Sequence, residues 1–157
     1  MLRIKKVKLT KEKKIMMLYE KQVTSYSWDE YQFTCSEEAM PTFYKALSDL
    51  NEHVIEMCEL PESYIDRITV KGVSYSYGGE NETMGATISA SMRLNNANCD
   101  LNINTPHKAS EPYNEGGQED ENQLLSGDCV DCLNVLAAEC EEYINGKRAQ
   151  GNLFDVA

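Results

Sequence analysis

The stretch Met84-Gly-Ala-Thr-Ile-Ser-Ala-Ser-Met-Arg-Leu94 places an apolar residue at every second position. Alternate side chains of a β-strand point to the same face, so this spacing predicts a strand with one face against a core. The preceding stretch, Ile65-Asp-Arg-Ile-Thr-Val-Lys-Gly-Val-Ser-Tyr-Ser-Tyr77, is rich in β-branched and aromatic residues and predicts an antiparallel partner strand. Residues 78–83, with two glycines and an asparagine, supply the turn of this hairpin.

The apolar phase of the first of these strands changes at Gly72. The apolar residues up to Val70 share one parity, and those after Gly72 share the other. A phase shift of one residue at a glycine predicts a β-bulge, which redirects the side chains that follow it. If the bulge turns Tyr75 and Tyr77 onto the polar face of the sheet, these two tyrosines become candidate contacts for a protein partner.

Further periodic segments complete the predicted fold. Three more strands are expected at residues 2–9, 15–20 and 28–35, and a short final strand at residues 99–103. Apolar residues spaced by three and four predict two amphipathic helices, one opening at Ser36 and ending before Pro61, the other at residues 128–145. We therefore expect an α+β fold, an antiparallel sheet of about five to six strands with both helices on one face.

The chain length of 157 residues fits one domain, which we place at residues 1–146 with a tail at 147–157. Residues 105–127 contain two prolines, three glycines and few apolar anchors, so we expect an acidic mobile loop or an interaction segment there. No apolar run approaches the roughly 18 residues of a membrane span, and the first residues lack the apolar core of a secretory signal. We expect a cytoplasmic protein of a bacterial host cell that makes no membrane contact.

The net charge of −11 is distributed unevenly. The first 22 residues carry eight basic and two acidic side chains, a local charge of +6, so the remainder carries −17. Such an acidic chain should repel nucleic acid and be attracted to a basic protein groove, including one that normally holds nucleic acid. Glu119, Asp120 and Glu121 are candidate residues for this contact. The lysines of residues 2–14 suit a sheet edge that must avoid pairing, or alternatively a basic arm for nucleic acid.

The cysteines give the main hint of site chemistry. Cys129-Val-Asp-Cys132 has CxxC spacing, which makes Cys129 and Cys132 weak candidates for a metal site. A zinc site there needs two further ligands, and Cys99 and His107 are the residues that could be recruited. We favour reduced thiols packed on the core side of the last helix, because no export signal accompanies the six cysteines.

No catalytic residue and no cofactor is predicted, and we do not expect an enzyme. The carboxylates lie in contexts typical of a solvated surface, and neither histidine is accompanied by an activated-nucleophile motif. His53 lies beside Glu52 and Glu56 on the expected polar side of its helix, so we expect a solvated surface histidine. Phosphate-binding glycine motifs are missing, because Gly78-Gly79 is not followed by a helix start with Lys and Ser or Thr.

The most specific short motif is Gln150-Gly-Asn-Leu-Phe154 near the C-terminus. It resembles the bacterial sliding-clamp-binding motif, whose pattern is Gln, two variable residues, then Leu-Phe. The resemblance implies that Leu153 and Phe154 fill an apolar pocket of the clamp while the Gln150 amide hydrogen-bonds at its rim. The alternative is that Leu153 and Phe154 fold back onto the core of their own domain.

Longer phrases resemble a group of uncharacterised small prophage-encoded proteins of Firmicutes. The phrases are Trp28-Asp-Glu-Tyr31, Ile68-Thr-Val-Lys-Gly-Val-Ser-Tyr-Ser-Tyr-Gly-Gly79, Asn104-Thr-Pro-His-Lys-Ala-Ser-Glu-Pro-Tyr113 and Lys147-Arg-Ala-Gln-Gly-Asn-Leu-Phe154. The resemblance implies a phage context, in which proteins of this size serve DNA metabolism or inhibit host defences.

The expected function is that of a non-enzymatic phage-type accessory protein that contacts DNA-transaction machinery, with docking on the sliding clamp through its tail. The alternative is an acidic inhibitor of a host defence nuclease, an anti-CRISPR or anti-restriction protein that mimics nucleic acid. A third, weaker alternative is a small-ligand-binding protein. The expected partner is a host or phage protein of DNA metabolism or defence, with no direct nucleic-acid contact.

Overall fold

The predicted hairpin forms strands β4 (Ile68–Gly78) and β5 (Thr83–Arg93) of an antiparallel sheet. The computed structural model describes residues 1–112 and 123–149. Six strands follow one another in the order β3-β2-β1-β4-β5-β6, and a two-residue strand, β7, pairs with β5. The other strands are β1 Leu2–Leu9, β2 Ile15–Thr24, β3 Ser27–Cys35, β6 Asp100–Asn104 and β7 Lys108–Ala109.

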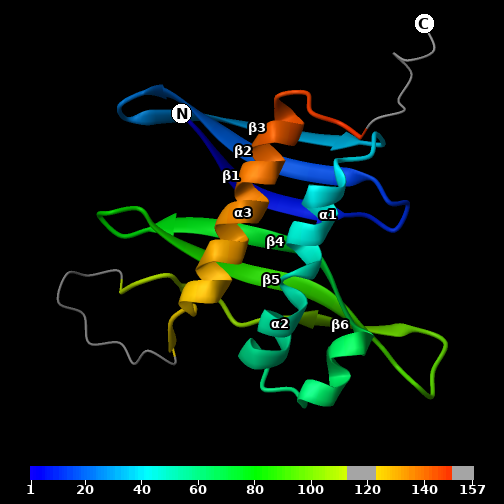
Figure 1. Cartoon of the computed structure of the whole chain (residues 1–157). Coiled ribbons are helices and arrows are strands. Elements are labelled where there is room, and N and C mark those ends of the chain that lie inside the picture. Colours follow the sequence, from blue (N-terminus) through cyan, green and yellow to red (C-terminus); the bar gives the residue numbers. More distant parts are fainter. Residues whose placement is uncertain (113–122, 150–157) are drawn as a thin grey trace, which may run out of the picture.

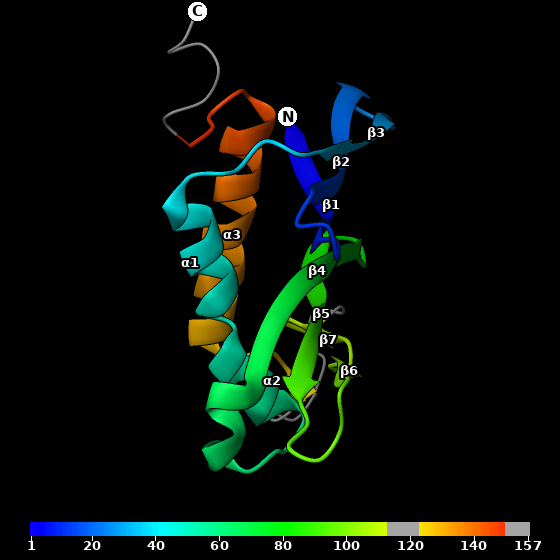
Figure 2. The same ribbon diagram turned by 90° about the vertical axis from the view of Figure 1, so that its right-hand side faces the viewer.

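The helices all lie on one face of this sheet (Figures 1 and 2). They are α1 (Pro41–Ser48), α2 (Asn51–Met57), a short 3-10 helix η1 (Glu62–Arg67) and α3 (Gly127–Ile144). Apolar side chains of α1, α2 and α3 meet those of β1, β2, β4 and β5 in one core. The α+β prediction is therefore confirmed.

The predicted bulge is present in β4. The register of β4 on β5 shifts between Val70 and Gly72, so that Lys71 is the extra residue. Because of this shift Val70 and Val73 both belong to the core, at 4% and 2% exposure. A Cβ atom at Gly72 would lie 2.4 Å from the carbonyl oxygen of Val7, so the close approach of β1 requires glycine here.

The first predicted helix differs from the observed one at both its start and its middle. It begins at Pro41 rather than Ser36, and Met40 is extended, because a residue that precedes proline is disfavoured in the helical region. The helix is also interrupted at residues 49–50, where the Leu50 N–H donates to the Leu47 carbonyl with the short spacing of a 3-10 turn. Two short helices, α1 and α2, therefore replace one long helix.

The lysine-rich strand β1 is not a sheet edge, so that prediction is wrong. Its register pairs Val7 with Met17 of β2 on one side and with Val73 of β4 on the other. Lys6 and Lys8 alternate with buried Val7 and belong to the face that no helix covers. The edge next to β2 is β3, a strand without lysine or proline.

The predicted loop at residues 105–127 is partly regular structure. Lys108–Ala109 pair with β5, and the Thr105 hydroxyl accepts a hydrogen bond from the Ile88 N–H at 2.9 Å. After the gap, the Leu125 N–H donates to the Ala109 carbonyl at 2.9 Å. Residues 113–122 of this segment lie outside the described residues.

The end of α3 is held to the domain. Gly146 has φ +105°, the left-handed conformation that commonly follows the end of a helix and favours glycine. The Arg148 guanidinium lies 3.5 Å from the Tyr143 ring centroid, and the Ala149 N–H donates to the Glu38 carbonyl at 3.0 Å. Residues 147–149, which we assigned to the tail, thus contact the domain. In the described ranges no helix has the length and apolar character needed to cross a membrane.

Candidate functional site

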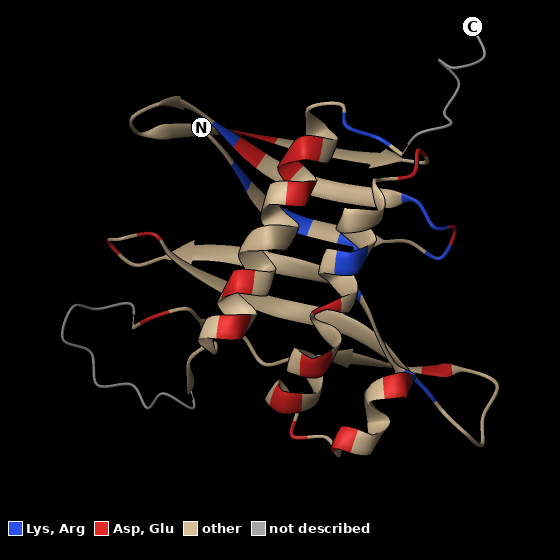
Figure 3. Ribbon diagram, in the orientation of Figure 1, with Lys and Arg blue, Asp and Glu red and all other residues tan. Residues whose placement is uncertain are grey.

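The helices and their turns carry more acidic than basic residues (Figure 3), and most of these acidic side chains are exposed. We call the surface that they form the acidic helical layer and define it by residues of α1–α3 and the turns between and after them: Asp49, Glu52, Glu56, Glu59, Asp128, Asp131, Glu139, Glu141 and Glu142. The basic residues in the same helices and turns are Lys45, Lys147 and Arg148. The layer is therefore strongly negative, and the lysines of the chain lie mainly in β1 and the β1–β2 turn.

The amphipathic pattern of α3 explains why its acids point outward. Its buried side chains, Cys129, Leu133, Leu136, Cys140 and Tyr143, follow one another at spacings of three and four. Burying this stripe on the sheet leaves Asp128, Asp131, Glu141 and Glu142 in solvent.

Ion pairs neutralise only part of the layer. Lys45 Nζ lies 2.9 Å from Asp49 Oδ2, and Lys147 Nζ lies 3.0 Å from Glu142 Oε2. Both pairs are at least two-fifths exposed, so each contributes little to stability. The remaining acids give the layer a field that attracts a basic surface.

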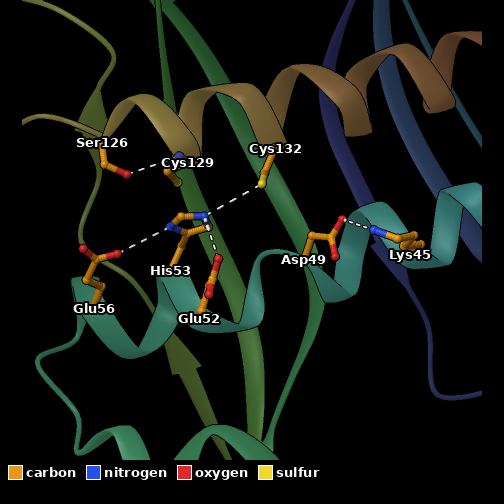
Figure 4. Close-up of polar contacts among 8 residues, drawn as sticks. All are labelled: Lys45, Asp49, Glu52, His53, Glu56, Ser126, Cys129 and Cys132. Carbon is orange, nitrogen blue, oxygen red and sulfur yellow. Dashed lines mark hydrogen bonds and ion pairs between the residues drawn. The ribbon is translucent and has the colours of Figure 1, made fainter.

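His53 is buried, and the prediction of a solvated surface histidine is wrong. It is 3% exposed and lies between α2 and α3 (Figure 4). Its Nδ1 is 3.5 Å from Glu56 Oε2, its Nε2 is 3.8 Å from Glu52 Oε1, and both carboxylates are largely exposed. His53 follows buried Leu50 by three residues, and residues three apart lie on the same face of a helix. This spacing is the feature of the sequence that indicates a buried His53.

Cys132 contacts His53 from α3, with Sγ 3.8 Å from Nε2 (Figure 4). Burial raises the pKa of the Cys132 thiol, and the nearby carboxylates of Asp49 and Glu52 raise it further. A raised pKa keeps the sulfur protonated at neutral pH, and a thiol is a poor nucleophile. The pair is therefore a contact between helices whose electrostatics oppose nucleophilic activation.

The other thiol of the CxxC motif is buried. Cys129 is 2% exposed, and burial raises its pKa to about 12. Among the described residues, no group of three or more His, Cys, Asp and Glu side chains could hold a metal ion. His107, which we considered as a further ligand, instead places Nε2 2.7 Å from Ser76 Oγ, and Cys99 is exposed.

A pocket of about 540 Å³ lies beside His53, between α2 and the beginning of α3. Glu56, Glu59, Lys108, Ser126 and Cys129 contribute to its lining. Its lining includes both acidic and basic side chains. It is the candidate site for a ligand under the small-ligand alternative. A second pocket of about 570 Å³ lies beside the β4–β5 turn.

Tyr75 is a core residue, so its prediction as a partner contact is wrong. It is 4% exposed, and its hydroxyl donates to the Leu133 carbonyl at 2.7 Å. Tyr77 is half-buried, and its hydroxyl donates to the Ile4 carbonyl at 2.8 Å. The bulge at Gly72 directs Tyr75 toward the helices, away from the polar face.

The remaining predicted partner-binding residues lie outside the described residues. They are Glu119, Asp120 and Glu121 in the central segment and Gln150, Leu153 and Phe154 in the tail.

Comparison with known proteins gave no match: none among protein-family models, none among curated proteins and none among solved structures.

Proposed function

We propose that this chain is a non-enzymatic, phage-type accessory protein that acts by protein–protein contact on DNA-transaction or defence machinery. Its acidic helical layer docks on a basic protein surface that otherwise holds nucleic acid. The observation that supports this most strongly is the difference in local charge: the acidic helical layer holds nine acidic against three basic residues, whereas β1 and the β1–β2 turn hold seven basic residues against one acidic residue. Complementary charge speeds encounter and selects the partner.

The alternative of a host-nuclease inhibitor uses the same surface. An acidic helix face presents carboxylates as a duplex presents phosphates, and the nuclease groove is lined with Lys and Arg. The nuclease inhibitor and the accessory protein would therefore bind their partners through the same acidic surface. The identity of the captured protein distinguishes the two functions.

Charge reversal tests the proposal. Asp131 and Glu141 are exposed residues of α3, and the double variant D131K/E141K replaces two negative charges of the layer by two positive ones, a shift of +4. The matched control E80K/D100K makes the same change in exposed residues outside the helices. In pull-downs from a bacterial host lysate, a basic nucleic-acid-binding protein should be retained by the wild type and the control and lost by D131K/E141K.

Salt provides a second readout of the same contact. Retention should fall steeply as ionic strength rises from about 50 to 300 mM, because screening weakens contacts between oppositely charged surfaces. Capture that survives D131K/E141K, or that salt leaves unchanged, would refute docking through the acidic helical layer.

The sliding clamp is the second candidate partner, and the tail motif favours it. The last described residue, Ala149, donates its backbone N–H to the Glu38 carbonyl. A purified bacterial sliding clamp should bind the full chain and lose binding to L153A/F154A, whereas D131K/E141K should still bind. Equal binding of L153A/F154A would eliminate the tail contact and leave the helical layer as the tested surface.

A further inference from the structure

The edge strand β3 offers a docking surface separate from the acidic helical layer. It stands at the end of the strand order, and its described pairings are all with β2 (Figure 1). The strand is nine residues long, whereas β6 at the opposite edge has five. A long edge presents a row of backbone N–H and C=O groups that can pair with another strand.

Edges of this kind are normally blocked by lysine, proline, other charged side chains or bulges, and of these β3 carries two charged side chains, Asp29 and Glu30. It contains no lysine and no proline, and its register on β2 is regular from Gln22 opposite Trp28 to Ile15 opposite Cys35. Its middle is open to solvent, with Tyr31 at 44% exposure. Tyr31 also stacks on Tyr19 of β2, with ring centroids 5.3 Å apart, which orders its side chain.

We propose that β3 pairs with β3 of a second copy of this chain, antiparallel and centred on Tyr31, to form one continuous sheet across a two-fold axis. Residue 31 is the midpoint of Ser27–Cys35, so this register is the one that pairs all nine residues. Two-fold pairing is self-complementary, and each contact occurs twice.

The distribution of charge along β3 supports a second copy as the occupant. Both acids, Asp29 and Glu30, lie before the midpoint, and the half after it carries no charge. Antiparallel pairing places Glu30 opposite the partner copy's position 32, a glutamine, and Asp29 opposite position 33, a phenylalanine. Like charges directly opposite one another destabilise paired strands. In this register no two like charges are directly opposite.

Electrostatics outside the edge set the sign of the salt effect. Each chain carries a net charge of −11, so two copies repel one another over longer distances. Added salt screens this repulsion and should strengthen self-association. Docking of the acidic helical layer on a basic protein should instead weaken with salt, so the two contacts are distinguishable in the same buffer series.

Substitution at Gln32 tests both the edge and its register. Lys at position 32 faces Glu30 of the partner copy twice in the dimer, and Glu at position 32 faces it with like charge. In sedimentation velocity across protein concentrations, Gln32→Lys should tighten the dimer about fivefold and Gln32→Glu should weaken it by a similar factor. The controls Asn102→Lys and Asn102→Glu make the same charge changes at an exposed residue of β6. Both should leave the dissociation constant of the dimer nearly unchanged.

The possible results separate cleanly. A dimer that tightens with Gln32→Lys, weakens with Gln32→Glu and strengthens with salt supports the proposal. A monomer at every concentration up to the millimolar range overturns it. A dimer that responds to neither substitution, or that weakens with both, uses another surface or another register and equally overturns it. Circular dichroism of each variant verifies that the fold is retained.

Discussion

The imidazole Nε2 of His53 lies 3.8 Å from the thiol Sγ of Cys132, and this contact joins α2 to α3 inside an acidic surface. The other ring nitrogen, Nδ1, is buried and lies 3.5 Å from Glu56 Oε2, but it makes no hydrogen bond among the described residues. A buried polar atom without a hydrogen bond costs about 1–3 kcal/mol. The His53 side chain therefore fills space between α2 and α3, while its unsatisfied nitrogen lowers the free energy of unfolding.

Substitutions at His53 should separate packing from polarity. His53→Leu keeps most of the volume and removes the unsatisfied nitrogen, so we expect a free energy of unfolding equal to or above that of the wild type. His53→Ala leaves a cavity and should lose about 2 kcal/mol or more. Urea unfolding measures both, with Glu141→Gln at an exposed position of α3 as a surface control that changes stability by less than about 0.5 kcal/mol. A loss in His53→Leu as large as in His53→Ala would contradict this account.

The glycine at the bulge should be the least replaceable glycine of the sheet. Gly72→Ala places a Cβ 2.4 Å from the Val7 carbonyl oxygen, a backbone atom that cannot move without disturbing β1. We expect a loss of about 2 kcal/mol or more in the free energy of unfolding, the range for steric strain in a packed core. Gly127→Ala is the matched control, because nothing lies within 4 Å of its added Cβ. Equal urea midpoints for the two variants would refute the steric argument.

Sequence alone predicts the sheet well because its signal is local. The alternation in β5 and the phase shift at Gly72 need no knowledge of the neighbouring strands, and both appear in the structure. The order of the strands cannot be predicted in this way. Nothing within residues 2–9 indicates that β4 pairs with β1 and makes β1 an interior strand of the sheet. The buried state of His53 likewise depends on where α3 crosses α2, a long-range contact that composition does not reveal.

Tyr75 and Tyr77 should differ in their contribution to stability. Tyr75→Phe removes a buried hydroxyl that donates to the Leu133 carbonyl at 2.7 Å and should cost about 1–2 kcal/mol of unfolding free energy. Tyr77→Phe removes a half-buried hydroxyl, where water can replace it, and should cost less. Thermal unfolding of the two variants provides the comparison. Since Tyr75 is a core residue, its replacement by Phe should leave partner binding unchanged, and a selective loss of binding would reverse that assignment.

Buried thiols should make the protein less stable in alkali. Burial raises the pKa of Cys129 from 9.0 to about 12, so the folded state favours the protonated thiol. This contribution is complete below pH 9, where the unfolded thiol is still protonated, and is lost as the pH rises from 9 through about 12. The urea midpoint of the wild type should therefore fall between pH 8 and pH 10. The fall should be smaller in Cys129→Ala and unchanged in Cys99→Ala, which lacks only an exposed thiol. Equal slopes in all three proteins would show that Cys129 ionises in the folded state as easily as in the unfolded chain.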